Sequence, residues 1–224
     1  MGALSVIWAP VSVLARIAEE RRVMLGFGVV ALYAALGLVT AAIAALGGLY
    51  AGQLTPQIIR DLSPEFYENA PRLISVALLV LAVANPFLWW LAISALMQLV
   101  TRFFGGTGAF SAMFAIVGVA NVPFVIQAAL QLSLIALQIA IGPESVATYI
   151  IGTLTTLLGL AFLVWHVVLV VIGAAFARRI GYGQSAGSCA ISCAGCAGLI
   201  LIVAVVFGIL IAVFVGALGS AGPS

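Results

Sequence analysis

Amide side chains recur along one apolar run of this 224-residue chain, and their spacing is the first pattern that suggests chemistry. Gln127, Gln131 and Gln138 stand four and seven residues apart, so on a helix they fall within about 40° of one another. Amides rarely face lipid, and we therefore expect this stripe to face another helix or a water-filled path. The first interpretation is interhelical hydrogen bonding, at about 0.6–2 kcal/mol per bond, and the second is the lining of a polar path.

His166 is the single histidine, and it stands beside Trp165 in the middle of another apolar run. An ionisable residue inside a membrane is a functional candidate, but no carboxylate accompanies this one as a partner. We expect a packed histidine that bonds Asn121, a glutamine or a backbone carbonyl. Asn85 can bond either the carbonyl freed by Pro86 or a neighbouring helix. The candidate path, or set of interhelical bonds, then consists of Asn85, Asn121, Gln127, Gln131, Gln138 and His166.

Three thiols follow an i, i+4, i+7 pattern near the end of the chain, at Cys189, Cys193 and Cys196. Three cysteines on one face are able to hold zinc, and the last two form a CxxC pair. The surrounding segment, SAGSCAISCAGCAG, is made almost wholly of small residues that let helices approach closely. We therefore expect these cysteines to act as small packing residues, and we expect no metal or other cofactor.

A short loop precedes the amide-bearing run, and it contains Gly105-Gly106-Thr107-Gly108. Its backbone amides could cradle a phosphate, although turn geometry explains the same glycines. No Walker loop, GxSxG, HExxH or intramembrane acidic pair is present, so we expect a protein that is not an enzyme. The candidate positions for contact with a partner protein are Arg102, Gly105, Gly106, Gly108, Arg178 and Arg179.

Composition determines the class of element that must position these groups. Hydrophobic residues make up 65% of the chain and charged residues 6%, with a mean hydropathy of +1.34. A soluble domain carries about 25% charged residues, so this composition excludes one. The net charge of +2 is too small to suggest nucleic-acid binding. The length allows one membrane domain and no separate soluble one.

Apolar runs predict an all-α, polytopic membrane protein with five transmembrane helices. A polar connection at 51–72 separates the first two spans, and its Ser63-Pro64-Glu65 segment predicts the capped start of a short helix. Pro86 and Pro123 predict kinks. The membrane domain covers 23–218 and a tail covers 219–224; the spans are 23–50, 73–100, 109–141, 146–177 and 186–218.

Residues 1–22 predict a short amphipathic helix on the membrane surface. Pro10 suits a first helical turn, after which Val11, Leu14 and Ala18 fall on one face. Trp8 would then lie at the level of the lipid headgroups. The alternative for this segment is a solvated lead-in to the first span.

The eight basic residues are all arginine, and their distribution predicts orientation. With five spans and a cytoplasmic N-terminus, six arginines face the cytoplasm and only Arg60 and Arg72 face the other side. This arrangement obeys the positive-inside rule, so we expect the N-terminus inside and the C-terminus outside. The cytoplasmic-side residues are Arg16, Arg21, Arg22, Arg102, Arg178 and Arg179.

The chain resembles the Yip (Ypt-interacting protein) domain family over roughly 15–218. Two features carry the resemblance: a basic, glycine-rich loop followed by a small-residue and proline core, and a Trp165-to-Gly173 run followed by RRIGYGQSAGSCA. Matching residues in the first feature are Gly105, Gly106, Gly108, Phe110, Val117, Gly118, Ala120 and Pro123.

The resemblance implies five helices with a cytoplasmic N-terminus, and eukaryotic members are linked to Rab GTPases and transport between ER and Golgi. This chain has no long N-terminal region and no DLYGP-like motif, so it looks more like the compact prokaryotic members. We expect a non-enzymatic membrane-organising or trafficking-type adaptor in the cytoplasmic membrane, acting as a homo-oligomer. Its expected partners are membrane lipids and other membrane or peripheral proteins. The alternative is a small transporter, channel or lipid-translocating protein, which a polar cavity at mid-membrane depth would support.

Overall fold

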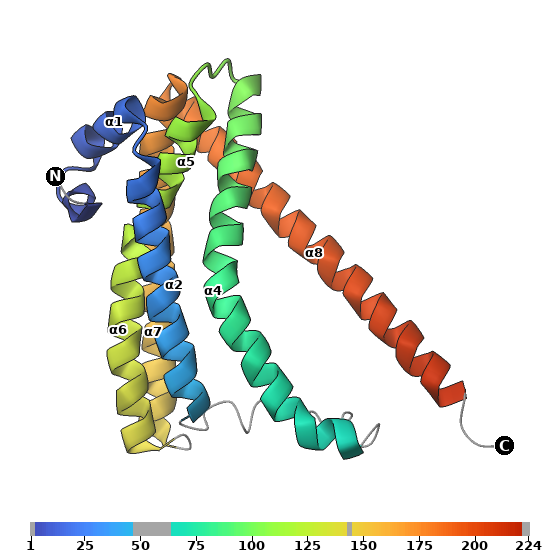
Figure 1. The fold of residues 1–224 in the computed structure, drawn as a ribbon. Helices are drawn as coiled ribbons and strands as arrows, with labels where there is room; N and C mark the ends of the chain where they lie inside the picture. Colours follow the sequence, from blue (N-terminus) through green and yellow to red (C-terminus); the bar gives the residue numbers. More distant parts are fainter. Residues whose placement is uncertain (1–2, 47–63, 143–144, 221–224) are drawn as a thin grey trace.

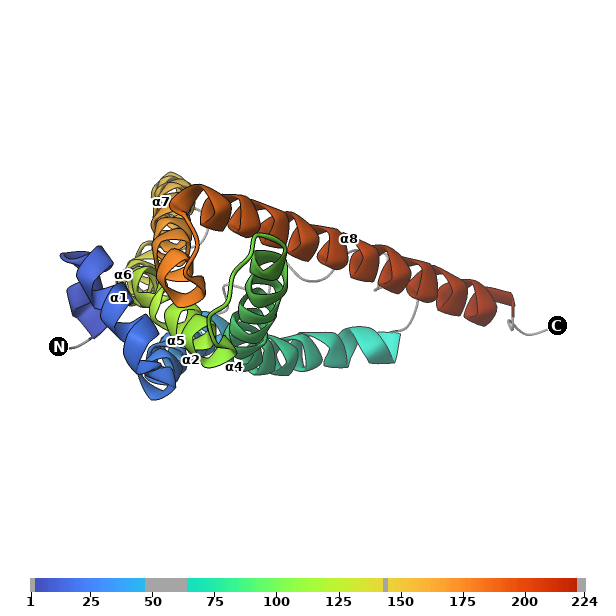
Figure 2. The same ribbon diagram turned by 90° about the horizontal axis from the view of Figure 1, so that it is seen from above.

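The computed structural model describes residues 3–46, 64–142 and 145–220, and within these ranges every regular element is a helix. Figure 2 shows α2, α5, α6 and α7 gathered into a bundle, with α4 and α8 extending to one side. The elements are η1 (Ala3–Ile7), α1 (Pro10–Glu20), α2 (Val23–Leu46), α4 (Pro64–Phe103), α5 (Phe110–Val119), α6 (Val122–Ile141), α7 (Val146–Arg178) and α8 (Tyr182–Ser220).

Four stretches of the described chain are long and apolar enough to cross a membrane: Val23–Leu46, Val76–Phe103, Phe110–Ile141 and Val146–Arg178. They coincide with the first four predicted spans. The predicted fifth span lies within the helix α8, which leans away from the bundle in Figure 1. Whether α8 crosses the membrane stays a prediction.

The second span begins differently from the expectation. The sequence places a polar connection at 51–72 with a short helix after Ser63, but α4 runs without interruption from Pro64 to Phe103. The expected short helix is therefore the first part of one long helix, which continues through Pro71. Ser63 itself and the rest of 47–63 lie outside the described residues. At the other end of the chain, Gly219 and Ser220 of the expected tail belong to α8.

The third predicted span is divided in two by a turn at Ala120 and Asn121, between α5 and α6. Pro123 has no N–H for the carbonyl four residues earlier, so the hydrogen-bond ladder cannot continue. The Asn121 side chain bonds the end of α5, since its Nδ2 donates to the carbonyl oxygens of Val117 at 2.7 Å and Gly118 at 3.3 Å. The 109–141 stretch is thus two helices joined by a tight turn, where the sequence predicts one kinked helix. By contrast, α4 continues as a helix through Pro86.

Helix α5 forms the centre of the bundle and is buried along nearly its whole length. Two glycines allow this burial. A β-carbon on Gly118 would lie 2.6 Å from the Cα of Gly26 in α2, and one on Gly173 in α7 would lie 2.3 Å from the Ile116 side chain. The close approach of these backbones follows from the small residues, as in other membrane helix pairs.

Helix α1 packs on protein through Val13, Leu14, Ile17 and Ala18 and contacts α5 and α7. Val11, expected on the same apolar face, is exposed instead. Trp8 is 87% exposed, which suits a headgroup-level position.

Candidate functional site

One end of the bundle gathers α1, the 104–109 loop and the junction of α7 with α8 (Figure 1). Arg178 lies at the centre of this end and is only 2% exposed. Its Nε donates to Thr101 Oγ1 at 3.0 Å, and its Nη2 donates to the carbonyl oxygen of Gly106. The Thr107 N–H donates to the Arg178 carbonyl at 3.1 Å. Arg178 therefore ties the end of α4 and the following loop to the end of α7, and it is not available as a surface contact.

The glycines of the loop fit against this arginine and its neighbour. A β-carbon on Gly108 would stand 1.6 Å from the Ala177 carbonyl oxygen, and one on Gly106 would stand 2.8 Å from the Thr101 carbonyl oxygen. Gly105 has a φ of +81°, which favours glycine for a different reason. The turn therefore explains only Gly105, and close packing explains the other two.

The loop amides are already used within the protein. Gly105 N–H donates to Arg102 O at 3.0 Å, and Gly106 N–H to Thr101 O at 2.9 Å. With the Thr107 bond, three consecutive amides point at protein carbonyls. These three amides therefore do not form a free phosphate cradle.

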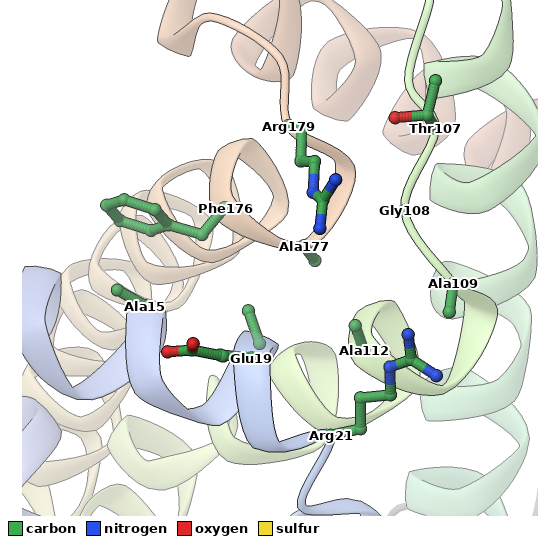
Figure 3. Close-up of a pocket in the computed structure, with 11 residues that line it drawn as sticks. Ala15, Glu19, Arg21, Thr107, Gly108, Ala109, Ala112, Phe176, Ala177 and Arg179 are labelled. Atoms are coloured by element: carbon green, nitrogen blue, oxygen red, sulfur yellow. The ribbon is translucent and has the colours of Figure 1, made fainter.

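A cavity of about 500 Å³ opens beside the loop, between α1, the start of α5 and the end of α7 (Figure 3). We call it the arginine cavity, because Arg21 and Arg179 line it from two different helices. Both residues have left-handed backbone conformations, with φ of 53° and 58°, and both close a helix. The remaining lining residues are Ala15, Ala18, Glu19, Thr107, Gly108, Ala109, Ala112, Phe176 and Ala177.

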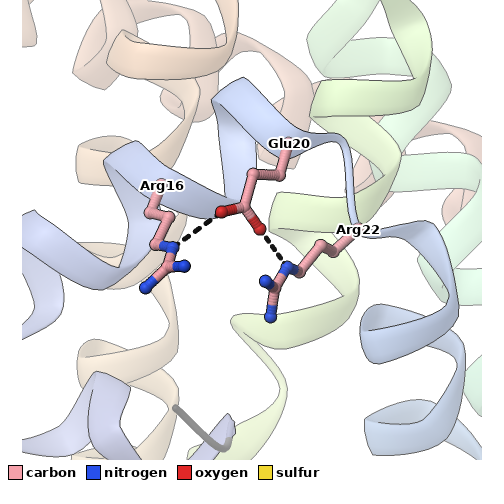
Figure 4. Close-up of polar contacts among 3 residues, drawn as sticks. All are labelled: Arg16, Glu20 and Arg22. Atoms are coloured by element: carbon pink, nitrogen blue, oxygen red, sulfur yellow. Dashed lines mark hydrogen bonds and ion pairs between the residues drawn. The ribbon is translucent and has the colours of Figure 1, made fainter.

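The arginines at this end differ in their ion pairs. Glu20 binds Arg16 at 2.7 Å and also Arg22, as Figure 4 shows. The hydrogen bond from Arg16 is the main cause of the lowered pKa of the Glu20 carboxyl. Within the described residues, Arg21 and Arg179 have no such carboxylate partner. Arg102 is exposed and also has no ion pair among the described residues, but of these three arginines only Arg21 and Arg179 line the cavity.

His166 is buried in α7, and its Nδ1 lies 2.8 Å from the carbonyl oxygen of Ala120. A carbonyl oxygen can only accept, so Nδ1 carries the proton in this contact. The ring also stacks on Phe124, with centroids 4.7 Å apart. His166 thus holds the α5–α6 turn against α7, at the carbonyl next to the break.

The glutamines of α6 meet different neighbours. Gln131 lines a second cavity of about 200 Å³ between α2, α4 and α6, together with Tyr33, Thr40 and Asn85. We call it the amide cavity. Gln127 points to α7 instead, where its Nε2 lies 3.0 Å from the place of a β-carbon on Gly159. Gln138 is partly exposed near the other end of α6. The structure therefore brings Asn85 and Gln131 together and separates them from Gln127, Asn121 and His166.

The cysteines of α8 do not share one environment. Cys189 and Cys196 are buried, and Cys193 is exposed. In the described part of the chain, no group of three His, Cys, Asp or Glu side chains is placed to hold a metal ion.

The sequence did not reveal that Arg21 and Arg179 line the same cavity, nor which groups Arg178 binds. The available signal was that two helices each end in an arginine, where glycine is the usual residue for the left-handed conformation. That signal does not say which helix ends meet, so the cavity was not visible in the sequence.

These features define a helical membrane protein with several spans and a polar, arginine-bearing end. The Yip1 domain model matches residues 4–205, and the chain belongs to the Yip1 domain family. The resemblance found in the glycine loop and the proline core is thereby confirmed. A search of curated proteins and a search of solved structures found no match.

Proposed function

We propose that this protein is a non-enzymatic, membrane-organising adaptor of the cytoplasmic membrane, with five spans and its N-terminus inside. The observation that carries the proposal is the ordered arginine-bearing end, where Arg178 fastens the 104–109 loop to α7. A loop fastened in this way presents a fixed surface, and a preorganised surface loses less entropy on binding.

The exposed residues at this end suit a protein partner. Phe103 is 82% exposed, and Arg102, Arg179 and Tyr182 are also exposed. Arginine and aromatic residues are enriched at protein interfaces and among the residues that dominate binding energy. The partner that fits is a peripheral or membrane protein with an acidic segment that meets this surface.

Photo-crosslinking in native membranes tests the adaptor. A benzophenone amino acid replaces Phe103 or Tyr182, and the control replaces Tyr149, which is 71% exposed at the start of α7, at the other end of the bundle. We expect a reproducible protein adduct from the first two positions and none from the third. Arg102→Gln should weaken the Phe103 adduct, because it removes a charge next to the crosslinker. Absence of a reproducible adduct at both positions would contradict the adaptor.

A second function is favoured by the amide cavity. Tyr33, Thr40, Asn85 and Gln131 provide polar atoms between three apolar helices, which suits passage of a small polar solute or a lipid headgroup. Solute or lipid flux in proteoliposomes tests it, with Gln131→Leu as the variant and Gln127→Leu as the control on the same helix. We expect flux to fall at least tenfold in the first variant only. Equal flux in wild type and Gln131→Leu would reject transport through this cavity.

A further inference from the structure

The arginine cavity holds two guanidinium groups that form no ion pair with a carboxylate of the described residues. In Figure 3 the side chains of Arg21 and Arg179 extend toward Ala109, Ala112 and Ala177, while the Glu19 carboxylate lies at the far side, near Ala15. Arg178, buried behind the loop, adds a third positive charge. The cavity and its surroundings therefore carry more positive than negative charge, because Glu19 is the one carboxylate residue among those that line it.

The chemistry of these groups selects the ligand. Guanidinium groups bind phosphate through paired, charge-assisted hydrogen bonds, and they lose less hydration than an ammonium group when they do so. Two guanidiniums from different helices can bind two edges of one phosphate. A phosphate group is therefore the anion that this arrangement fits.

Besides Glu19, Thr107 and Gly108, the cavity is lined by apolar side chains, which favours a lipid over a soluble phosphate compound. Five alanines and Phe176 surround the two arginines. The cavity also lies where three of the apolar stretches end, since Arg21 precedes Val23, the loop follows Phe103, and Arg179 follows Arg178. A ligand with a charged head and an apolar body meets both kinds of surface at this depth.

We propose that the arginine cavity binds the phosphate group of an anionic membrane phospholipid. Arg21 and Arg179 bind the phosphate, and the alanines and Phe176 contact the glycerol and the first methylene groups. The proposal does not rest on the adaptor function. It stands on the cavity, so its failure would leave the crosslinking result unchanged.

The backbone conformation of the two arginines allows each guanidinium group to be removed without straining the backbone. Both residues occupy the left-handed conformation at a helix end, where glycine is the preferred residue. Arg21→Gly and Arg179→Gly therefore remove the guanidinium while easing the backbone. The matched control is Arg16→Gln with Arg22→Gln, which removes two arginines of the same end that pair with Glu20 outside the cavity.

Native mass spectrometry of the full chain, purified in detergent doped with phosphatidylglycerol or phosphatidylcholine, measures retained lipid. We expect wild type to retain phosphatidylglycerol selectively. Each glycine variant should weaken retention about tenfold, as expected for the loss of a charge-assisted bond. The Arg16→Gln/Arg22→Gln control should stay within about twofold, because these side chains are exposed and already paired.

Two further measurements distinguish a lost lipid site from a damaged fold, and lipid binding from binding of free phosphate. Glu19→Gln should strengthen retention by about two- to fivefold, because a nearby negative charge is removed, and a damaged fold would not produce a gain. Inorganic phosphate at millimolar concentration should fail to displace the lipid. Unchanged retention in both glycine variants, an equal loss in the control, or complete displacement by inorganic phosphate would each overturn the proposal.

Discussion

Arg178 shows how one residue can take a different role from the one its sequence context suggests. It stands in a pair of arginines at a helix end, which is typical of a solvated, membrane-flanking position. Its neighbour Arg179 fits that description, but Arg178 turns inward to Thr101 and Gly106. The Thr101 hydroxyl also donates to the Met97 carbonyl at 2.6 Å, so it bonds α4 and α7 at once.

Replacing Arg178 by Met should destabilise the protein, because Thr101 and Gly106 lose a charged donor in a buried place. We expect a loss of about 2 kcal/mol, which corresponds to roughly 4–8 °C in melting temperature for a chain of this size. Thermal unfolding in detergent measures it. Arg102→Met, at an exposed position in the last turn of α4, is the control and should change the melting temperature by less than about 2 °C. Equal stability of Arg178→Met and wild type would show that the two bonds contribute nothing.

Replacing His166 by Phe tests the contact at the helix break. The ring stacking on Phe124 is kept, but the donor to the Ala120 carbonyl is lost, and hydrogen bonds between membrane helices contribute about 1 kcal/mol. We expect a lower melting temperature for His166→Phe and little change for Trp165→Phe, the exposed neighbour. If both variants unfold like wild type, the bond to Ala120 does not hold the turn in place.

At the scale of the elements, α5 determines how closely the helices approach. The Gly26–Gly118 contact brings α2 and α5 together, and the Gly173–Ile116 contact brings α7 to α5. Trp90 of α4 also binds α5, because its Nε1 donates to the Phe114 carbonyl oxygen at 2.8 Å. The short α5 can be buried on all sides because its neighbours contribute small residues where they cross it.

The Gly118 contact gives a matched pair of substitutions. Gly118→Ala should destabilise by about 1–3 kcal/mol, because its β-carbon would overlap the Gly26 backbone and force two helices apart. Gly28→Ala, on α2, meets open space and should stabilise slightly, by about 0.5–1 kcal/mol, because alanine is the better helix former. Melting temperatures in detergent should therefore move in opposite directions. A higher melting temperature in both variants would mean that helix propensity, not packing, dominates at Gly118.

At the scale of the whole molecule, the bundle has two unlike ends. Six arginines belong to the end formed by α1, the 104–109 loop and the α7–α8 junction, whereas Arg72 belongs to the first part of α4, at the other end (Figure 1). This distribution supports an orientation with the arginine-bearing end in the cytoplasm.

Reporter fusions at the two termini test that orientation and the number of spans together. Five spans place the C-terminus outside and the N-terminus inside, so only a C-terminal tag should be accessible to a protease added to intact cells. Protection of both tags would show an even number of spans, with α8 remaining on the inner side. The control is the same assay after permeabilisation, which should expose both tags.

Composition and the lengths of apolar runs were sufficient to predict a helical membrane protein and its first four spans, because both properties are local to each helix. The glycine loop and proline core were sufficient for the family. Nothing in the sequence indicated that Gln131 meets Asn85 while Gln127 meets Gly159, or that Arg178 is buried and Arg179 is not. Those outcomes depend on how each helix is rotated about its axis and where it crosses its neighbours. The arginine cavity needs three segments from distant parts of the chain, and only their packing brings Arg21 to Arg179.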